Sequence, residues 1–186
     1  MSSEREQELR KVTIGEPWRV DGPIALAEYD PGWPALFDRE AKRIRGALGD
    51  RALLLEHAGS TSVPGLAAKP IIDIVLAVSD SSDEDTYLPD LEAAGYVLRI
   101  REPEWYEHRV FKGPDTNINL HVFSEGCEEI GLMLAFRDHL RANEADRELY
   151  ERSKRELAAR DWAFVQDYAD AKTEVVREIG ARARLH

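Results

Sequence analysis

The stretch that decides the fold is EHAGSTSVPGLAAKPIIDIVLAV, residues 56–78. It begins with small and hydroxyl-bearing residues, passes a Pro-Gly turn, and ends in an apolar run that contains one carboxylate, Asp73. A segment that is apolar at nearly every position is typical of a strand buried on both faces of a sheet. The pattern therefore predicts a central strand over residues 69–78 with a carboxylate inside it.

Asp73 needs a partner in such a strand. Side chains alternate along a strand, so Asp73 shares one face with Val75, while Ile72 and Ile74 point to the other. A buried ionised carboxylate is costly unless it is paired or bound to a metal. We therefore expect Asp73 to face a pocket, a cation or a hydrogen-bonded network. The alternative is an aspartate that satisfies backbone N–H groups near the end of the strand.

The remaining pattern predicts an α+β protein, in which a mixed sheet is flanked by helices and C-terminal helices cover one face or edge. Residues 1–22 are predicted to form a loose arm or a short helix, and residues 23–186 one domain whose helical part begins near residue 128. Further strands are predicted over 24–30, 52–59, 96–100, 108–113 and 117–123. Helices are predicted over 34–48, from the 79–85 loop to about 94, and over 128–142, 144–160 and 163–183.

Composition narrows the classes of function. The chain has 186 residues, is 43% hydrophobic and carries a formal net charge of -11 at pH 7, which opposes general binding to nucleic acid or to an anionic membrane. No apolar run is long enough to span a bilayer, and the charged N-terminus lacks the apolar core of a secretory signal. A single cysteine, Cys127, excludes an internal disulfide and a cysteine-based metal site. These features predict a cytoplasmic protein.

The segment before the central strand is a candidate anion-binding turn. Gly59 to Ser62 follow a predicted strand directly, and small residues let backbone N–H groups approach an anion while hydroxyl groups add donors. The spacing is not that of a Walker A loop, because Lys69 lies in the next segment. The alternative is a surface turn that is rich in serine and glycine.

The strand NINLHVF, residues 117–123, has one polar face formed by Asn117, Asn119 and His121. Metal ligand, general base and satisfied core histidine are all open roles for His121. Glu56 and His57 are adjacent on a strand and so point to opposite faces. Only one of them can join Asp73.

The C-terminal helices contain candidate anion ligands. Lys172 interrupts an apolar stripe of helical spacing, either with its ammonium in water or as a phosphate ligand beside Tyr168. Arg137 and Arg141 are four residues apart and point together, as an anion clamp or as part of a solvated face. Arg109 and Lys154 have the same two interpretations.

These residues resemble the GrpB family of small bacterial and archaeal proteins. The resemblance runs from about residue 24 to near the end of the chain. It includes YDPGW (29–33), EHAGSTSVPGLAAKPIIDI (56–74), HRVF (108–111), NLHVF (119–123), FRDHLRANEADRELYERSKRELA (136–158) and YADAKTEVV (168–176). It implies a nucleotidyltransferase-like fold. The usual signature of that fold is a Gly-Ser turn, a strand with two carboxylates two residues apart, and a third carboxylate on a later strand, which together hold two Mg²⁺ ions.

This chain matches the signature in part. Gly59 and Ser60 match the turn and Asp73 matches the first carboxylate, but Val75 stands at the second position and His121 where the third acid is expected. The resemblance therefore implies a divergent protein that binds a nucleotide or another phosphorylated small molecule with one divalent metal, Mg²⁺, Mn²⁺ or Zn²⁺.

Two functions remain open at this point. In the first, the protein transfers a nucleotidyl or phosphoryl group, with Asp73 and His121 as catalytic residues that also bind the metal together with Glu56 or His57. The residues assigned to phosphate binding are Gly59, Ser60, Thr61, Ser62, Lys69, Arg109, Arg137, Arg141, Tyr168 and Lys172. In the second, the chain is a non-catalytic ligand-binding or partner module. Relatives with a GrpB domain fused to dephospho-CoA kinase imply a protein partner in coenzyme A metabolism.

Overall fold

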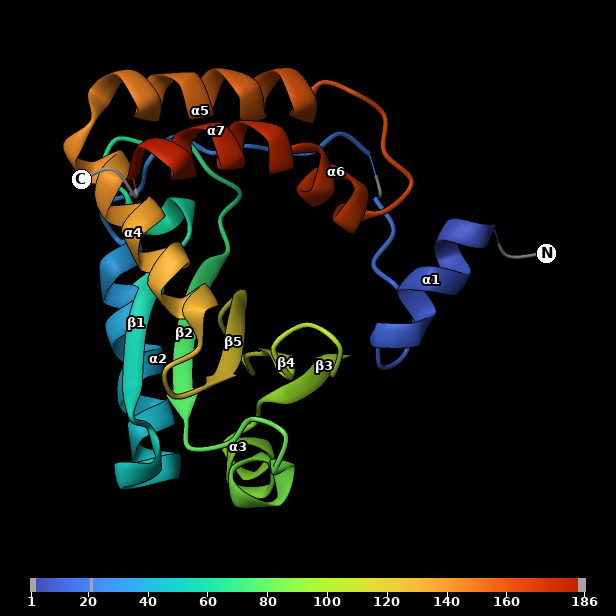
Figure 1. Cartoon of the computed structure of the whole chain (residues 1–186), viewed down its shortest axis with the longest axis vertical. Coiled ribbons are helices and arrows are strands. Elements are labelled where there is room, and N and C mark those ends of the chain that lie inside the picture. The colour runs from blue at the N-terminus through green and yellow to red at the C-terminus, as the bar shows by residue number, and fades with distance from the viewer. Residues whose placement is uncertain (1–2, 21, 184–186) are drawn as a thin grey trace.

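The computed structural model describes residues 3–20 and 22–183, and it contains one five-stranded sheet with the strand order β1-β2-β5-β4-β3 (Figure 1). The central pair β2 and β5 is parallel, and the other neighbouring pairs are antiparallel. The sheet is therefore mixed, as predicted. The strands are β1 Leu54–Ala58, β2 Ile72–Val78, β3 Val97–Glu102, β4 His108–Lys112 and β5 Ile118–Ser124.

Seven α-helices lie in the described part of the chain, and they confirm the α+β class. They are α1 Glu4–Val12, α2 Trp33–Leu48, α3 Leu88–Ala93, α4 Glu128–Ala142, α5 Glu144–Ala158, α6 Val165–Ala171 and α7 Thr173–Ala183. Within the described ranges, none of the helices is long and apolar enough to cross a bilayer.

Two predicted elements were wrong. The helix predicted over 163–183 is two helices that meet at Lys172. There the N–H of Lys172 donates to the carbonyl of Ala169, three residues earlier, at 3.2 Å, and so the α-helical i−4 hydrogen bond is replaced by a 3₁₀-type one. The strand predicted over 24–30 is not part of the sheet. It contributes an isolated bridge in which Ala27 and Ala68 exchange backbone hydrogen bonds, so this segment lies beside the loop between β1 and β2.

One face of the sheet forms the main core. Ile72, Ile74 and Leu76 of β2 alternate onto this face, and they pack with Ile118 and Leu120 of β5. Helices α2 and α3 cover them. Each of these five side chains is at most 1% exposed, which explains why β2 is continuously apolar apart from Asp73.

The opposite face is covered unevenly. Helix α4 packs Ile130 against Val75, Ala77 and Phe123, and so closes the part of this face near β1. Helices α5, α6 and α7 lie across one end of the sheet (Figure 1). The β1–β2 loop packs there against α4, α5 and α7, because Val63 and Leu66 share a buried cluster with Leu140, Tyr150 and Ile179. The uncovered part of this face carries the polar residues described below.

The N-terminal segment contains the short helix that was one of the two predicted forms. It is anchored to the rest of the chain, because Arg5 donates to Asp167 at 2.8 Å and Thr13 bridges to Ile100. The predicted division at residues 22 and 23 stays a prediction.

Candidate functional site

The parallel pairing of β2 and β5 brings Asp73 next to the polar face of NINLHVF. Asp73 stands opposite Asn119, and His121 stands opposite Val75, one step along the same face. Asn119 donates its Nδ2–H to Asp73 Oδ1 at 2.9 Å, and His121 Nε2 lies 3.4 Å from the same oxygen. The carboxylate inside the buried strand is therefore satisfied by a network from the neighbouring strand.

Asp73 is held as a carboxylate. Burial alone opposes its ionisation, but hydrogen bonds from His121 and Asn119 and the positive charge of Lys172 outweigh that effect and lower its pKa. Its side chain keeps 27% of its surface exposed, so a ligand can reach it.

A chain of side chains extends from His121 to the far edge of the sheet. His108 Nε2 lies 3.0 Å from His121 Nδ1, and His108 Nδ1 lies 2.7 Å from Glu102 Oε2. The two imidazole rings are stacked, with centroids 5.2 Å apart and planes 10° apart. Burial lowers the pKa of His108 to about 4, so its ring is neutral near pH 7.

These contacts determine which nitrogen of His121 is available. Glu102 accepts a hydrogen bond from the Nδ1–H of neutral His108. His108 Nε2 therefore has no proton and accepts a hydrogen bond from His121 Nδ1. With its Nδ1 proton directed to His108, His121 presents Nε2 to the carboxylate of Asp73. Nε2 and the Asp73 oxygen lie 3.4 Å apart, and a proton or another cation between them makes this contact favourable.

Four partly or fully buried lysines interact electrostatically with this carboxylate or with one another and are called the lysine cluster: Lys69, Lys112, Lys154 and Lys172. The negative charge of Asp73 acts on Lys69, Lys112 and Lys172, and the positive charge of Lys172 acts on Lys154. Burial lowers the pKa of each, to about 8 for Lys112 and about 7 for Lys154. Among the described residues, no carboxylate lies within ion-pair distance of any of these ammonium groups.

The lysine cluster is held by neutral groups. Lys69 and Lys172 lie against the ring of Tyr168, with Nζ 5.5 and 4.8 Å from its centroid. Lys112 donates to the amide oxygens of Asn117 and Asn119, both at 2.9 Å. Buried ammonium groups that lie near one another repel, and this lowers stability when no carboxylate pairs with them. Such an arrangement is typical of a site that binds an anion.

Gly59 lets the turn approach the carboxylate. Its φ is +67°, and a Cβ atom at this position would lie 2.3 Å from Asp73 Oδ2. The hydroxyls that follow have different roles. Thr61 donates to the carbonyl of Ile71 at 3.2 Å and Ser62 to that of Gly59 at 2.5 Å, whereas Ser60 contacts the lysine cluster through Lys154 at 3.0 Å.

The two adjacent residues Glu56 and His57 have partners other than Asp73. Glu56 shares its face, but the Glu56 carboxylate pairs with Arg137 at 2.8 Å. His57 lies on the opposite face, stacked on Phe37 with ring centroids 5.0 Å apart. The sheet therefore does not bring His57 to Asp73.

Three predicted anion ligands have other partners. Arg109 lies on the opposite face and is 4% exposed, with its guanidinium bonded to Glu84 at 2.5 Å, so it does not reach the lysine cluster. Arg137 donates to the carbonyl of His57 at 2.9 Å, and Arg141 donates to the carbonyl of Ser62 at 2.8 Å. The last two arginines tie α4 to β1 and to the turn that carries Ser60.

The family model described as GrpB protein matches residues 23–182. The chain belongs to the GrpB family. A UPF0157 protein of Halalkalibacterium halodurans is 65% identical to it over 96% of this chain and 91% of that protein. The crystal structure of the conserved protein GrpB from Enterococcus faecalis matches with a TM-score of 0.71 and 33% identity, over 86% of this chain and 96% of that one. A dephospho-CoA kinase of Mycolicibacterium paratuberculosis is 30% identical over 87% of this chain but only 46% of the kinase.

A metal ion would find few protein ligands in this GrpB-family chain. Within residues 3–20 and 22–183, no group of three or more His, Cys, Asp and Glu side chains is arranged to hold one. Asp73 and His121 Nε2 are the two donors that face each other. This donor set fits one divalent cation whose other ligands are water and phosphate oxygens. It does not fit the usual pair of Mg²⁺ ions.

Three contributors to the site were not considered from the sequence: Lys112, His108 and Glu102. The alternation of β4 places Lys112 and His108 on one strand face, which is a usable signal once β4 is known to neighbour β5. Lys154 had two interpretations from the sequence, an anion ligand or part of a solvated helix face, and the structure buries it.

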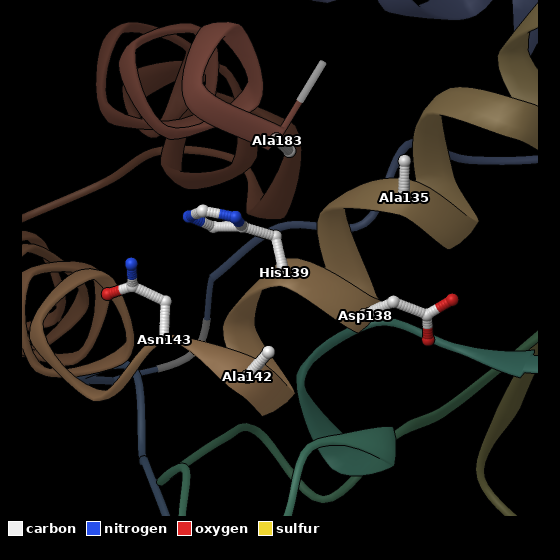
Figure 2. Close-up of a pocket in the computed structure, with 6 residues that line it drawn as sticks. All are labelled: Ala135, Asp138, His139, Ala142, Asn143 and Ala183. Atoms are coloured by element: carbon white, nitrogen blue, oxygen red, sulfur yellow. The ribbon is translucent and has the colours of Figure 1, made fainter. Parts of the chain in front are cut away.

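Surface hollows lie elsewhere on this GrpB-family chain. Figure 2 shows one of about 460 Å³ lined by Ala135, Asp138, His139, Ala142, Asn143 and Ala183. Its histidine bonds Asp146 through Nε2 at 2.7 Å, which joins α4 to α5. None of the residues that line it belongs to the lysine cluster or contacts Asp73.

The buried lysines predict a pH dependence of stability. Burial lowers the pKa of Lys154 to about 7 from 10.5, so above pH 7 the unfolded chain binds more protons than the folded chain. The free energy of unfolding should therefore rise with pH from about 7 to 9, by up to about 1.4 kcal/mol per pH unit for this lysine. Urea unfolding at several pH values checks this. Lys154→Met should flatten the rise and the exposed control Lys42→Met should not, so equal slopes in the two variants would contradict the assignment.

Proposed function

We propose that this chain binds a phosphorylated small molecule, such as a nucleotide, through the lysine cluster. One observation carries the proposal: four lysines that are at least partly buried have no ion-pair partners within the described residues, and the charge of Asp73 acts on three of them, Lys69, Lys112 and Lys172. A phosphate group would supply the missing negative charge and accept charge-assisted hydrogen bonds from several ammonium groups at once. Lys69, Lys112 and Lys172 are the ligands we assign to it.

Asp73 and His121 are assigned to a divalent cation that accompanies the phosphate. The hydrogen bonds from His121 to His108 and from His108 to Glu102 hold His121 with its Nε2 facing Asp73, as partners of metal-binding histidines commonly do. When bound, a cation would neutralise charge on the phosphate oxygens and so favour nucleotidyl or phosphoryl transfer.

The alternative, a non-catalytic partner module, is supported by Val75. This residue occupies the position of the second carboxylate in the fold's usual signature and is fully buried against α4. The similarity to part of a dephospho-CoA kinase points to coenzyme A metabolism as the setting for this alternative. A purified dephospho-CoA kinase from the same organism would then form a stable complex with the chain in sedimentation experiments. A complex without any ligand binding by the chain would favour the alternative.

Calorimetric titration tests the binding proposal. ATP, GTP, CTP, UTP and dephospho-CoA are each titrated in Mg²⁺, Mn²⁺, Zn²⁺ or EDTA. We expect at least one ligand to bind, and Lys69→Met with Lys172→Met to weaken it by roughly 100-fold, since a charge-assisted phosphate contact contributes about 1.5–3 kcal/mol.

Lys42→Met is the control, because this lysine is exposed on α2. It should bind like the unaltered protein. Equal affinity in the double variant and the control would contradict the assignment of the lysine cluster.

A further inference from the structure

Ser60 and Lys154 form a pair that phosphate binding alone does not explain. Lys154 is 2% exposed, and its Nζ lies 3.0 Å from Ser60 Oγ. Its second hydrogen bond goes to the carbonyl of Ala67. The ring of Tyr150 lies 4.9 Å from the same Nζ, and the Tyr150 hydroxyl also hydrogen-bonds with Ser60. One serine is thus held between a buried amine and a buried phenol.

The surroundings of Lys154 favour its neutral amine. Burial and the charge of Lys172 lower its pKa to about 7, with an opposing effect from Glu151 and a small further lowering from Arg155. A neutral amine has a lone pair that can accept the Ser60 proton. Burial raises the pKa of Tyr150 to about 12, although its hydrogen bond with Ser60 opposes this, so Tyr150 stays a neutral phenol near pH 7 and is not itself a base for that proton.

Ser60 differs from the other hydroxyls of its turn. Thr61 and Ser62 are buried and donate to backbone carbonyls, whereas Ser60 is half-buried. Ser60 follows Gly59, where an added Cβ would meet Asp73, and its hydroxyl contacts the lysine cluster through Lys154. Arg141 holds the far end of the turn through the carbonyl of Ser62. A reachable hydroxyl, a buried base and a fixed turn are the components of an activated nucleophile.

We propose that Ser60 is a nucleophile that takes up a phosphoryl group from a phosphoanhydride ligand, with Lys154 as its general base. This inference rests on the proposed phosphate site for its choice of substrate. In the step, Ser60 Oγ forms a bond to phosphorus and its proton moves to Lys154 Nζ. The P–O bond to the leaving phosphate breaks, and the leaving group departs with that electron pair. The product is phosphoserine at position 60.

A fluorophosphonate probe tests the nucleophile without an anionic ligand. Here the Ser60 Oγ–P bond forms, the P–F bond breaks and fluoride leaves, while Lys154 takes the proton. We expect one adduct per chain by intact mass, located on Ser60 by peptide mapping and absent in Ser60→Ala. Ser153→Ala, which alters the neighbour of Lys154 on α5, is the matched control and should be labelled normally.

The role of Lys154 has its own measurement. The labelling rate of the unaltered protein should rise with pH and level off above about pH 8, once the lysine is neutral. Lys154→Met should label at least 100-fold more slowly at pH 8, with a rate that keeps rising with pH. Thermal melts establish that each variant is folded, and Lys154→Gln replaces Lys154→Met if the latter is not. Labelling that is unchanged in the folded Lys154 variant, or that falls on other serines, would overturn the proposal.

A second probe identifies the substrate class. ATP that is radiolabelled at its terminal phosphate should leave acid-stable label on Ser60 and none on Ser60→Ala. Fluorophosphonate labelling without any nucleotide binding would sink the phosphate site and the phosphoanhydride substrate but keep the nucleophile. Nucleotide binding without either adduct on Ser60 would overturn the nucleophile and leave the proposed function intact.

Discussion

Gly59→Ala is expected to destabilise the protein by roughly 3 kcal/mol or more, because two costs coincide at this position. The backbone has a φ of +67°, which an alanine adopts only with strain, and the new Cβ would lie 2.3 Å from Asp73 Oδ2. The carboxylate cannot move away without weakening its hydrogen bond from Asn119. Urea unfolding followed by circular dichroism measures the loss.

Gly65→Ala is the matched control for this prediction. Gly65 has a φ of +78° and lies in the same loop between β1 and β2, but a Cβ there would meet no atom within 4 Å. Its substitution should cost only the backbone strain, about 1 kcal/mol. The difference between the two variants is then the cost of crowding Asp73. Equal losses would mean that the carboxylate is free to move and that the turn does not fix the site.

The segment that contains Gly59 and Asp73 was also the part most open to prediction. A buried strand is recognised from its own residues, and so is a carboxylate that breaks its pattern, since both are local properties. His121 could be proposed as the partner of Asp73, because the polar face of its strand is also recognised from the local sequence. Lys112 reaches the site only because β4 pairs with β5, which in turn pairs with β2. This strand order is a long-range property that local sequence patterns do not predict.

The helical contributions were harder to predict for a different reason. Lys154 lies in a highly charged segment that is typical of a solvated helix, yet α5 lies across the end of the sheet and buries it. The break between helices α6 and α7 at Lys172 has no proline or glycine that would predict it. The single apolar stripe over 163–183 instead favours one continuous helix. Such features result from packing against Tyr168 and the β1–β2 loop rather than from local propensity.

Asp73→Asn is expected to separate the two parts of the proposed site, because it removes a negative charge and keeps the shape of the side chain. The charge of Asp73 favours the ammonium forms of Lys69, Lys112 and Lys172. Without it, their mutual repulsion is uncompensated, and the free energy of unfolding near pH 7 should fall by about 1–3 kcal/mol. Added phosphate should restore stability by binding the folded state.

The affinity for a phosphorylated ligand should respond to the same substitution in opposite directions in EDTA and in divalent metal. In EDTA the ligand no longer faces a carboxylate, so calorimetry should show affinity that is higher by roughly tenfold, about 1.4 kcal/mol. In Mg²⁺ or Mn²⁺ the gain in affinity that the metal gives the unaltered protein should disappear, because the amide is a poor substitute for a charged ligand.

Asp50→Asn, which alters an exposed carboxylate after α2, is the control and should change neither value. Metal-dependent binding that survives in Asp73→Asn would mean that the cation sits elsewhere. A loss of affinity in EDTA would mean that Asp73 orders the lysine cluster rather than competing with its anion.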